Sequence, residues 1–224
     1  MTGLVLIAAS GLAREVLASV RRSGEHTVIG FLDDDPSLAG AVIDGVPVLG
    51  AVSAAARHRG AEFVLCAGKG ADRAAIAGRL ALLGIGPDRC ATIVDARAVV
   101  SPGCFVGSGS VLLANVVLTA GVRMGNHVVA MPGVTFTHDD VVADFATFTA
   151  GVSLGGGVRI GRGAYLGMNS TVREHCAVGV GAVVGMGAAV VTDVPDGETW
   201  AGVPARPLYP SAVRRIDGTM GRRA

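Results

Sequence analysis

The 224-residue sequence has few aromatic residues and few charges. Aromatic residues make up 4% of the chain and charged residues 17%, whereas an average soluble domain is about 25% charged. Nineteen basic and 18 acidic side chains leave a formal net charge of only +1. Such a chain is not expected to bind nucleic acid through its overall charge. Because half of the residues are hydrophobic, an intrinsically disordered chain is excluded as well.

The sequence also lacks the cysteine patterns of metal and redox sites. Its four cysteines, at positions 66, 90, 104 and 176, form no CxxC pair and have no histidine at zinc-binding spacing. We therefore expect neither a redox centre nor a bound metal. The apolar start carries no leading Lys or Arg, so we expect no signal peptide and a cytoplasmic location. Glycine, proline and asparagine interrupt the uncharged stretch 98–122, and we expect no membrane span there.

What the sequence has in excess is glycine, with 34 residues, and a repeat of six residues. Every sixth residue from Val94 to Val190 is apolar, at all 17 positions and without an insertion. Three residues later, glycine fills nine positions and asparagine two, which predicts a corner with positive φ. Four residues later the side chain is small at 16 positions, the exception being Asp140. This period predicts a parallel β-helix in which three hexads close each triangular coil.

Residues 1–92 lack this period and alternate between strand and helix patterns. Strands are predicted over 4–8, 27–32 and 62–66, and helices over 11–23, 51–58 and 71–83. This order predicts a small Rossmann-like parallel sheet, so that the chain divides into an α/β domain (1–92), a β-helix (93–207) and a basic tail (208–224).

Polar and glycine residues follow each predicted strand of this α/β domain. They are Ser10 and Gly11, then Asp33 and Asp34, then Gly68 and Lys69. Ligands of such sheets bind beyond the carboxyl ends of the strands. Because the first loop lacks a full GxGxxG, the pattern favours a site for one nucleotide-like ligand over a dinucleotide site. The alternative is a docking domain whose small residues serve only tight turns.

His138 is the histidine that the repeat pattern singles out. It lies one residue before a corner position in mid-prism, and Asp139 and Asp140 follow it. A histidine with an adjacent carboxylate can act as an oriented general base. The sequence does not decide which aspartate orients the imidazole. His127 and His175 occupy corner positions themselves and are interpreted as turn residues.

Six short motifs follow one another in the order of a known family. They are residues 10–15 (SGLARE), 30–34 (GFLDD), 67–70 (AGKG, with Arg73), 137–139 (THD), 166–170 (LGMNS) and 202–206 (GVPAR). Together they resemble the sugar O-/N-acyltransferase family of the sialic acid O-acetyltransferase and the UDP-4-amino-sugar N-acetyltransferase, over about residues 1–207. The resemblance implies a left-handed β-helix homotrimer that uses acetyl-CoA and no metal. It also implies an N-terminal domain that binds the nucleotide of the acceptor.

The resemblance also implies roles for individual residues. His138 is expected to be the general base, Asp139 its orienting carboxylate and the Gly156 N–H the oxyanion donor. The residues expected to contact CoA are Gly156, Met168, Gly185, Met186, Val203 and Pro204. The residues expected at the acceptor are Ser10, Gly11, Leu12, Asp33, Asp34, Gly68, Lys69, Arg73, Met131 and Thr147.

Three of these positions depart from the family pattern. Leu12 stands where many relatives carry histidine, although others carry an apolar residue followed by Gly-Arg-Glu, closer to residues 13–15 here. Thr147 stands where relatives carry a second histidine, and Met131 stands where some carry asparagine. The departures leave acyl transfer as the expected reaction and leave its acceptor open. We expect the acceptor to be an amine or hydroxyl of a nucleotide-linked sugar, and the alternative is a small metabolite of specialised biosynthesis.

A different class of function is a non-catalytic trimeric nucleotide-binding scaffold. Two further β-helix enzymes fit less well. A γ-class carbonic anhydrase needs a histidine where Ala143 stands, and a sugar nucleotidyltransferase needs a phosphate loop that residues 8–14 do not supply.

Overall fold

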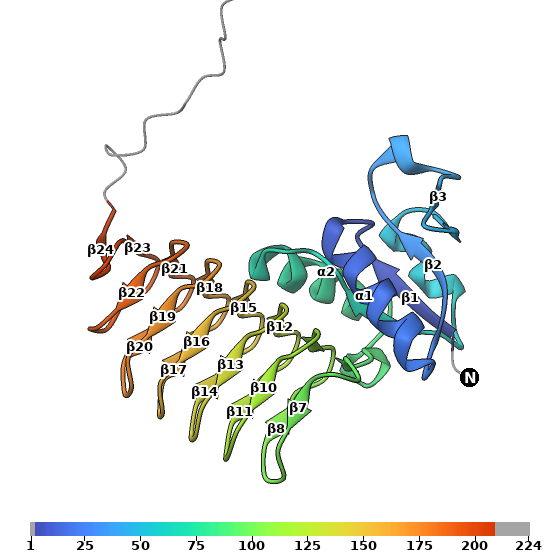
Figure 1. Cartoon of the computed structure of the whole chain (residues 1–224). Coiled ribbons are helices and arrows are strands. Elements are labelled where there is room, and N and C mark those ends of the chain that lie inside the picture. The colour runs from blue at the N-terminus through green and yellow to red at the C-terminus, as the bar shows by residue number, and fades with distance from the viewer. Residues whose placement is uncertain (1–2, 209–224) are drawn as a thin grey trace, which may run out of the picture.

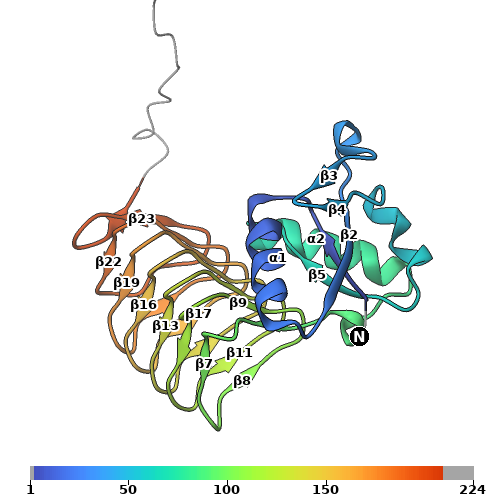
Figure 2. The same cartoon turned by 45° about the vertical axis from the view of Figure 1, so that its right-hand side comes forward.

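The computed structural model describes residues 3–208 and has two parts, an α/β layer and a left-handed parallel β-helix (Figures 1 and 2). Except for Leu208, the predicted basic tail lies outside the described residues. Among the described residues, no helix has both the length and the apolar character needed to cross a membrane.

The N-terminal layer is a three-stranded parallel sheet in the order β2-β1-β5. Its strands are β1 (Gly3–Ile7), β2 (Thr27–Leu32) and β5 (Glu62–Leu65), and its α-helices are α1 (Gly11–Ser23) and α2 (Gly70–Leu82). The connections hold the short hairpin β3 (Val42–Ile43) and β4 (Val46–Pro47) and the 3₁₀ helices η1 (Pro36–Leu38), η2 (Val52–Arg57) and η3 (Pro87–Arg89). The bounds predicted for the three strands and three helices are within one residue of these. Ser10 caps α1 by accepting a hydrogen bond from the Ala13 N–H.

The β-helix consists of two-residue strands that recur every six residues and stack into three flat faces. Face 1 contains β6 (Ile93–Val94), β9 (Val111–Leu112), β12 (Val129–Ala130), β15 (Thr147–Phe148), β18 (Tyr165–Leu166), β21 (Val183–Val184), β23 (Thr199–Ala201) and β24 (Arg206–Pro207). Face 2 contains β7 (Val99–Val100), β10 (Val117–Leu118), β13 (Thr135–Phe136), β16 (Ser153–Leu154), β19 (Thr171–Val172) and β22 (Ala189–Val190). Face 3 contains β8 (Phe105–Val106), β11 (Arg123–Met124), β14 (Val141–Val142), β17 (Arg159–Ile160) and β20 (Ala177–Val178).

The strand register confirms that three hexads close one coil. Val117 pairs with Val99 on one side and with Thr135 on the other, a spacing of three hexads in each direction. The corner prediction is confirmed as well, because every predicted corner position from 103 to 187 has a positive φ. We call the three edges of the prism corner 1/2, corner 2/3 and corner 3/1, after the faces that they join.

The repeated apolar positions point into the prism and form its core. Phe136 and Phe148 meet edge to face at 4.7 Å near the middle of this core. Val94 and Val100 are each 37% exposed, because the first coil has no coil beneath it. The period therefore predicts which residues form the core, and the core is exposed to solvent at the first coil.

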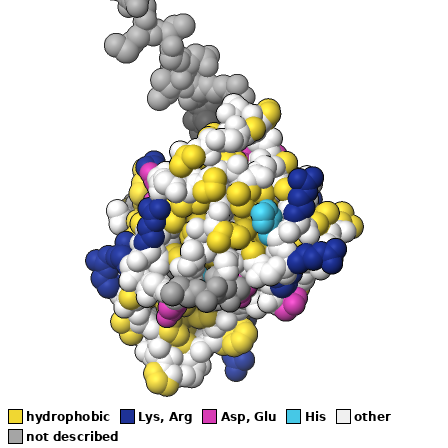
Figure 3. Space-filling model, turned by 90° about the vertical axis from the view of Figure 1, so that its right-hand side faces the viewer, with side chains coloured by type: hydrophobic (Ala, Val, Ile, Leu, Met, Phe, Trp, Pro, Cys, Tyr) yellow, Lys and Arg dark blue, Asp and Glu magenta, His cyan; other side chains and the backbone are white. Residues whose placement is uncertain are grey.

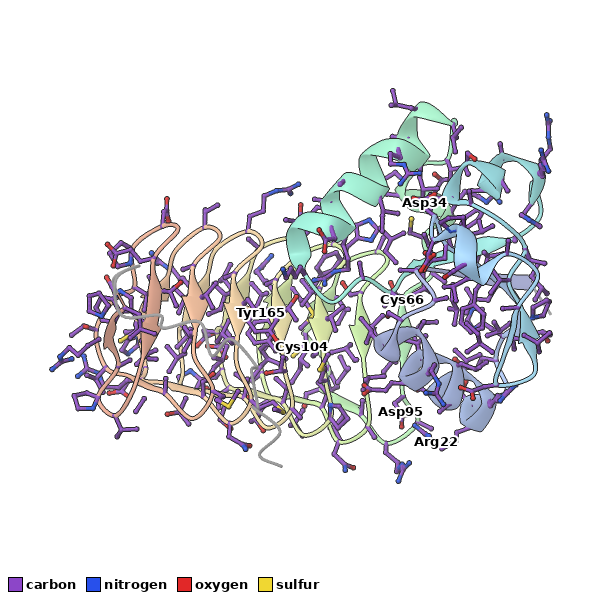
Figure 4. The ribbon with its side chains drawn as sticks, turned by 90° about the horizontal axis from the view of Figure 1, so that it is seen from above. Arg22, Asp34, Cys66, Asp95, Cys104 and Tyr165 are labelled. Carbon is purple, nitrogen blue, oxygen red and sulfur yellow. The ribbon has the colours of Figure 1, made fainter. Side chains whose placement is uncertain are left out.

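The N-terminal domain packs against the first coils of face 1. Val111 and Val129, which point outward from that face, belong to one apolar cluster with Leu4, Leu6 and Val64 of the N-terminal sheet. Asp95, at the start of the β-helix, is buried and ties this face to α1. It accepts hydrogen bonds from Ser19 Oγ (2.7 Å) and from Arg22, toward which it points in Figure 4. Burial alone raises the pKa of Asp95, but hydrogen bonds from Ser19, the Arg97 N–H and Arg22, with the charge of Arg22, outweigh it and lower that pKa to about 2.

A second contact joins α2 to the coils through the fully buried guanidinium of Arg73. Its nitrogens donate to the carbonyls of His127 (3.0 Å), Phe145 (2.9 Å) and Ala146 (3.0 Å), and to Thr147 Oγ1 (3.0 Å). They also donate to the carbonyls of Ala67 (2.9 Å) and Gly68 (3.0 Å) in the loop before α2. Burial lowers the pKa of Arg73 to about 10, so the group stays charged at neutral pH. Gly70 permits this close approach, because a Cβ there would overlap the Phe145 carbonyl oxygen.

We expect Arg73→Met to lower the free energy of unfolding by on the order of 3 kcal/mol, because it leaves several buried carbonyls without a donor. Urea denaturation measures this difference. The control is Arg57→Met at the exposed Arg57, which is expected to stay within about 0.5 kcal/mol of wild type. Equal stability of the two variants would contradict the role given to Arg73.

Candidate active site

The His138–Asp139 pair lies on corner 2/3, between β13 and β14. Nδ1 of His138 and Oδ2 of Asp139 are 3.0 Å apart, and the two side chains are 65% and 76% exposed. Asp139 has φ +62°, the predicted corner conformation. A carboxylate that accepts the Nδ1–H leaves the lone pair on Nε2, which is the nitrogen that a general base needs. The arrangement can therefore take up a proton from a group that approaches the corner.

Gly156 lies directly beside the imidazole, one coil further along the same corner. A Cβ at this position would overlap Nε2 of His138, so the missing side chain makes room for the ring. The carbonyl of Gly156 accepts a hydrogen bond from the His175 N–H (2.9 Å). Its own N–H makes no hydrogen bond among the described residues and is available as a donor.

Asp140 has a different role from Asp139, although the two are neighbours. Its carboxylate is fully buried and accepts the N–H groups of Thr137 (2.9 Å) and Val158 (2.8 Å). Burial raises the pKa of Asp140 to about 6, although the two N–H groups act to lower it. Asp140 therefore joins its own corner to the next coil, and the group in contact with the imidazole is Asp139.

The residues expected to contact CoA lie on two different corners. Gly156 is on corner 2/3, whereas Met168, Gly185 and Met186 are on corner 1/2. The side chains of Met168 and Met186 are 50% and 73% exposed, so both are accessible to a ligand. Val203, which is exposed, and Pro204 lie between β23 and β24 at the far end of the prism. One chain thus presents two separate halves of the expected CoA site.

The loops expected at the acceptor meet at the carboxyl ends of the N-terminal strands. Ser10 Oγ donates to the carbonyl of Cys66 (2.6 Å), and Asp33 Oδ2 accepts the N–H of Ala9 (2.7 Å). Asp34 pairs with Arg79 (2.5 Å) and accepts the Val52 N–H. These bonds hold the three loops together, with Gly11, Gly68 and Lys69 exposed beside them.

Lys69 and Gly68 also line a groove of about 580 Å³ between the start of α2 and face 1. Tyr165 and Val183 form part of its wall. The sequence did not indicate this groove, because it exists only where α2 meets the coils.

Figure 3, a view onto the N-terminal domain, shows Lys and Arg side chains scattered around the edge and not gathered in one patch.

Four of the residues expected at the acceptor are placed in the interface between the domains. Leu12 is buried in the apolar cluster there, and Met131 packs against it. Arg73 and Thr147 are fully buried and bonded to each other, and Thr147 Oγ1 donates to the carbonyl of Gly68 (3.0 Å). Arg73 and Thr147 thus have no free polar group for an acceptor and support the Gly68 loop from behind. The donors of Arg73 are taken up by buried backbone carbonyls of the coils.

Comparison with known proteins identifies the family. The PglD N-terminal domain model matches residues 3–80. The acetyltransferase domain of PglB from Neisseria gonorrhoeae FA1090 is 30% identical, with a TM-score of 0.85, over 93% of this chain and 100% of that one. A structure of that domain in complex with acetyl coenzyme A matches with the same identity and TM-score.

Two further solved structures are similar over most of their length. PerB from Caulobacter crescentus, in complex with CoA and GDP-perosamine, is 29% identical, with a TM-score of 0.85, over 93% of this chain and 98% of that one. WeeI from Acinetobacter baumannii AYE is 27% identical, with a TM-score of 0.82, over 92% of this chain and 100% of that one. No curated protein sequence matches the chain significantly.

The fold and these similarities define a hexapeptide-repeat acetyltransferase. The chain belongs to the sugar O-/N-acyltransferase family.

We expect Asp140→Ala to lower the free energy of unfolding by about 2 kcal/mol, because two buried N–H groups lose their acceptor. Alanine fits this position sterically, since the repeat places Ala146 and Ala164 in the equivalent slot. Asp139→Asn, which tolerates the corner conformation, is expected to change stability by less than about 0.5 kcal/mol. Thermal and urea unfolding compare the two variants. A larger loss for Asp139→Asn than for Asp140→Ala would contradict the assignment.

Proposed function

We propose that the protein transfers an acetyl group from acetyl-CoA to an amine or hydroxyl of a nucleotide-linked sugar, with His138 as the general base. The observation that carries this proposal is the 3.0 Å contact between His138 Nδ1 and Asp139, which leaves Nε2 free beside Gly156. The structures of relatives with acetyl coenzyme A, and with CoA and GDP-perosamine, support the two substrates. A perosamine N-acetyltransferase among them favours an amine over a hydroxyl.

The reaction is direct acyl transfer. The acceptor nitrogen attacks the thioester carbonyl carbon and loses its proton to Nε2 of His138. As the C–S bond breaks, CoA leaves as the thiol and takes a proton back from the imidazolium. Asp139 stabilises that imidazolium, and a positioned base of this kind contributes about 10²–10⁴ in rate. The free Gly156 N–H is the candidate donor to the developing oxyanion, a contribution on the order of 10²–10³.

The catalytic site is proposed to form between subunits of a homotrimer. The N-terminal domain covers face 1, whereas His138 lies on corner 2/3, the edge of the prism opposite that face. The base and the acceptor loops of one chain therefore lie on different sides of the prism. A threefold arrangement that brings corner 2/3 of one subunit against corner 1/2 of its neighbour unites the base with the neighbour's acceptor loops. It also unites the two halves of the expected CoA site.

We expect His138→Ala to reduce turnover about 100-fold or more, because the general base is removed. The measurement is thiol release from acetyl-CoA with a panel of UDP-, dTDP- and GDP-linked amino and hydroxyl sugars. The control is His58→Ala, a remote histidine of the N-terminal domain, which is expected to retain wild-type turnover.

Three other results would change the proposal. Full activity of His138→Ala would reject His138 as the base. Tight acetyl-CoA binding without thiol release for any sugar would move the acceptor outside sugar nucleotides. The absence of both binding and release would favour a scaffold.

The shared site predicts complementation between two inactive variants. His138→Ala removes the base, and Lys69→Glu places a negative charge where the acceptor's phosphates are expected. When the two chains are mixed in equal amounts during refolding, about three quarters of the trimers contain both variants, and each of these has one intact site of three. About a quarter of wild-type activity should therefore return. Size-exclusion chromatography checks the trimer. If each variant alone is inactive and the mixed trimers are inactive too, the base and the acceptor loops act within one subunit.

A further inference from the structure

Corner 2/3 carries a second imidazole beside the one proposed as the base. His175 follows β19 on this corner and has φ +60°. Its side chain is exposed and makes no hydrogen bond among the described residues. Gly and Asn take the same backbone conformation at other corners of the prism, so the turn itself does not require histidine.

The two imidazoles converge on one pair of glycines. The ring of His138 fills the space that a side chain at Gly156 would occupy, and the ring of His175 fills that of Gly157. In the latter case a Cβ on Gly157 would lie 2.8 Å from Nδ1 of His175. Because the glycines are consecutive, the rings approach the same dipeptide from the coils on either side of it.

Backbone hydrogen bonds hold this arrangement in place. The His175 N–H donates to the carbonyl of Gly156 (2.9 Å), and the Gly157 N–H donates to the carbonyl of His138 (2.8 Å). His175 is thus attached to the same peptide that presents the candidate oxyanion donor. The backbone of His175 is thus held before any ligand arrives, and its ring lies over Gly157.

The position of His175 along the prism indicates which substrate it meets. The N-terminal domain, with its acceptor loops, is hydrogen-bonded to the earlier coils up to Thr147, and the groove beside Lys69 extends further along face 1, to Tyr165 and Val183. The residues expected to contact CoA, such as Met168 and Met186, lie in later coils. His138 approaches the glycines from the acceptor side, and His175 approaches them from the CoA side. A ring N–H is a hydrogen-bond donor, and the thioester end of CoA offers carbonyl acceptors.

We propose that His175 is a second active-site imidazole that donates a hydrogen bond to a carbonyl at the thioester end of acyl-CoA. This inference rests on the proposed function, since it assigns the co-substrate of the same site. The contact holds the thioester over Gly156 and Gly157, within reach of a nucleophile that His138 has deprotonated. His138 takes the proton of the acceptor, and His175 binds the acyl donor.

The test compares His175→Gly with wild type in calorimetric binding of acetyl-CoA and in steady-state kinetics. Glycine keeps the corner conformation, so the variant is expected to fold and to melt at the wild-type temperature. The Kd and KM for acetyl-CoA should rise about three- to tenfold, the effect of one lost hydrogen bond. The KM for the acceptor should stay within about twofold. His175→Asn keeps the conformation and a shorter donor and should recover part of the loss.

The matched control is His58→Ala, which removes an imidazole of the N-terminal domain that lies outside the proposed site. It is expected to leave both constants unchanged. Unchanged acetyl-CoA binding in His175→Gly, or a rise confined to the acceptor KM, would overturn the proposal. The binding arm needs no acceptor, so it gives a result even if the acceptor proposed above is wrong.

Discussion

The left-handed corner at every sixth residue is the constraint on which this structure depends. Each corner must take a positive φ for three flat faces to close, and glycine meets that demand at the lowest cost. Some of the corners that carry other side chains have a further role. Asp139 orients the imidazole of His138, and Phe145 stacks against His127 at 5.0 Å beside the docked α2. Corner positions thus bear both the candidate catalytic pair and part of the attachment of the N-terminal domain.

The attachment of that domain determines where an acceptor can be held. Arg73 places a buried charge among backbone carbonyls of the coils, and Asp95 places one against α1. Each charge is stabilised by several hydrogen bonds, because a buried charge without them is costly. The two contacts hold the Gly68 loop over face 1 and leave corner 2/3 on the opposite edge. We therefore propose that a second subunit completes the site.

Much of the fold could be predicted because its signals are local. The six-residue period predicts the faces, the core and the corners, and the strand and helix patterns of residues 1–92 predict their elements to within one residue. His138 stands out for the same reason, since its carboxylate neighbours and its corner are adjacent in the chain. Asp139 and Asp140 could not be told apart, because only stacking brings the Val158 N–H to Asp140. The contact between Arg73 and Thr147 across the domain interface could not be predicted either, because the two residues are far apart in the sequence.

The sequence by itself determined the coil, its period and the position of the candidate base, since each of these depends on residues within a few positions of one another. The three-hexad coil also predicts that residues 18 positions apart stack, but only the tertiary structure decided which side chains meet across the coils and which residues of the two domains come together. It alone placed the His175 ring over Gly157 and the Arg73 guanidinium on the Phe145 carbonyl. The physical reason is that these contacts arise from the stacking of coils and the docking of one domain on another, and no local pattern encodes which side chain then finds which partner.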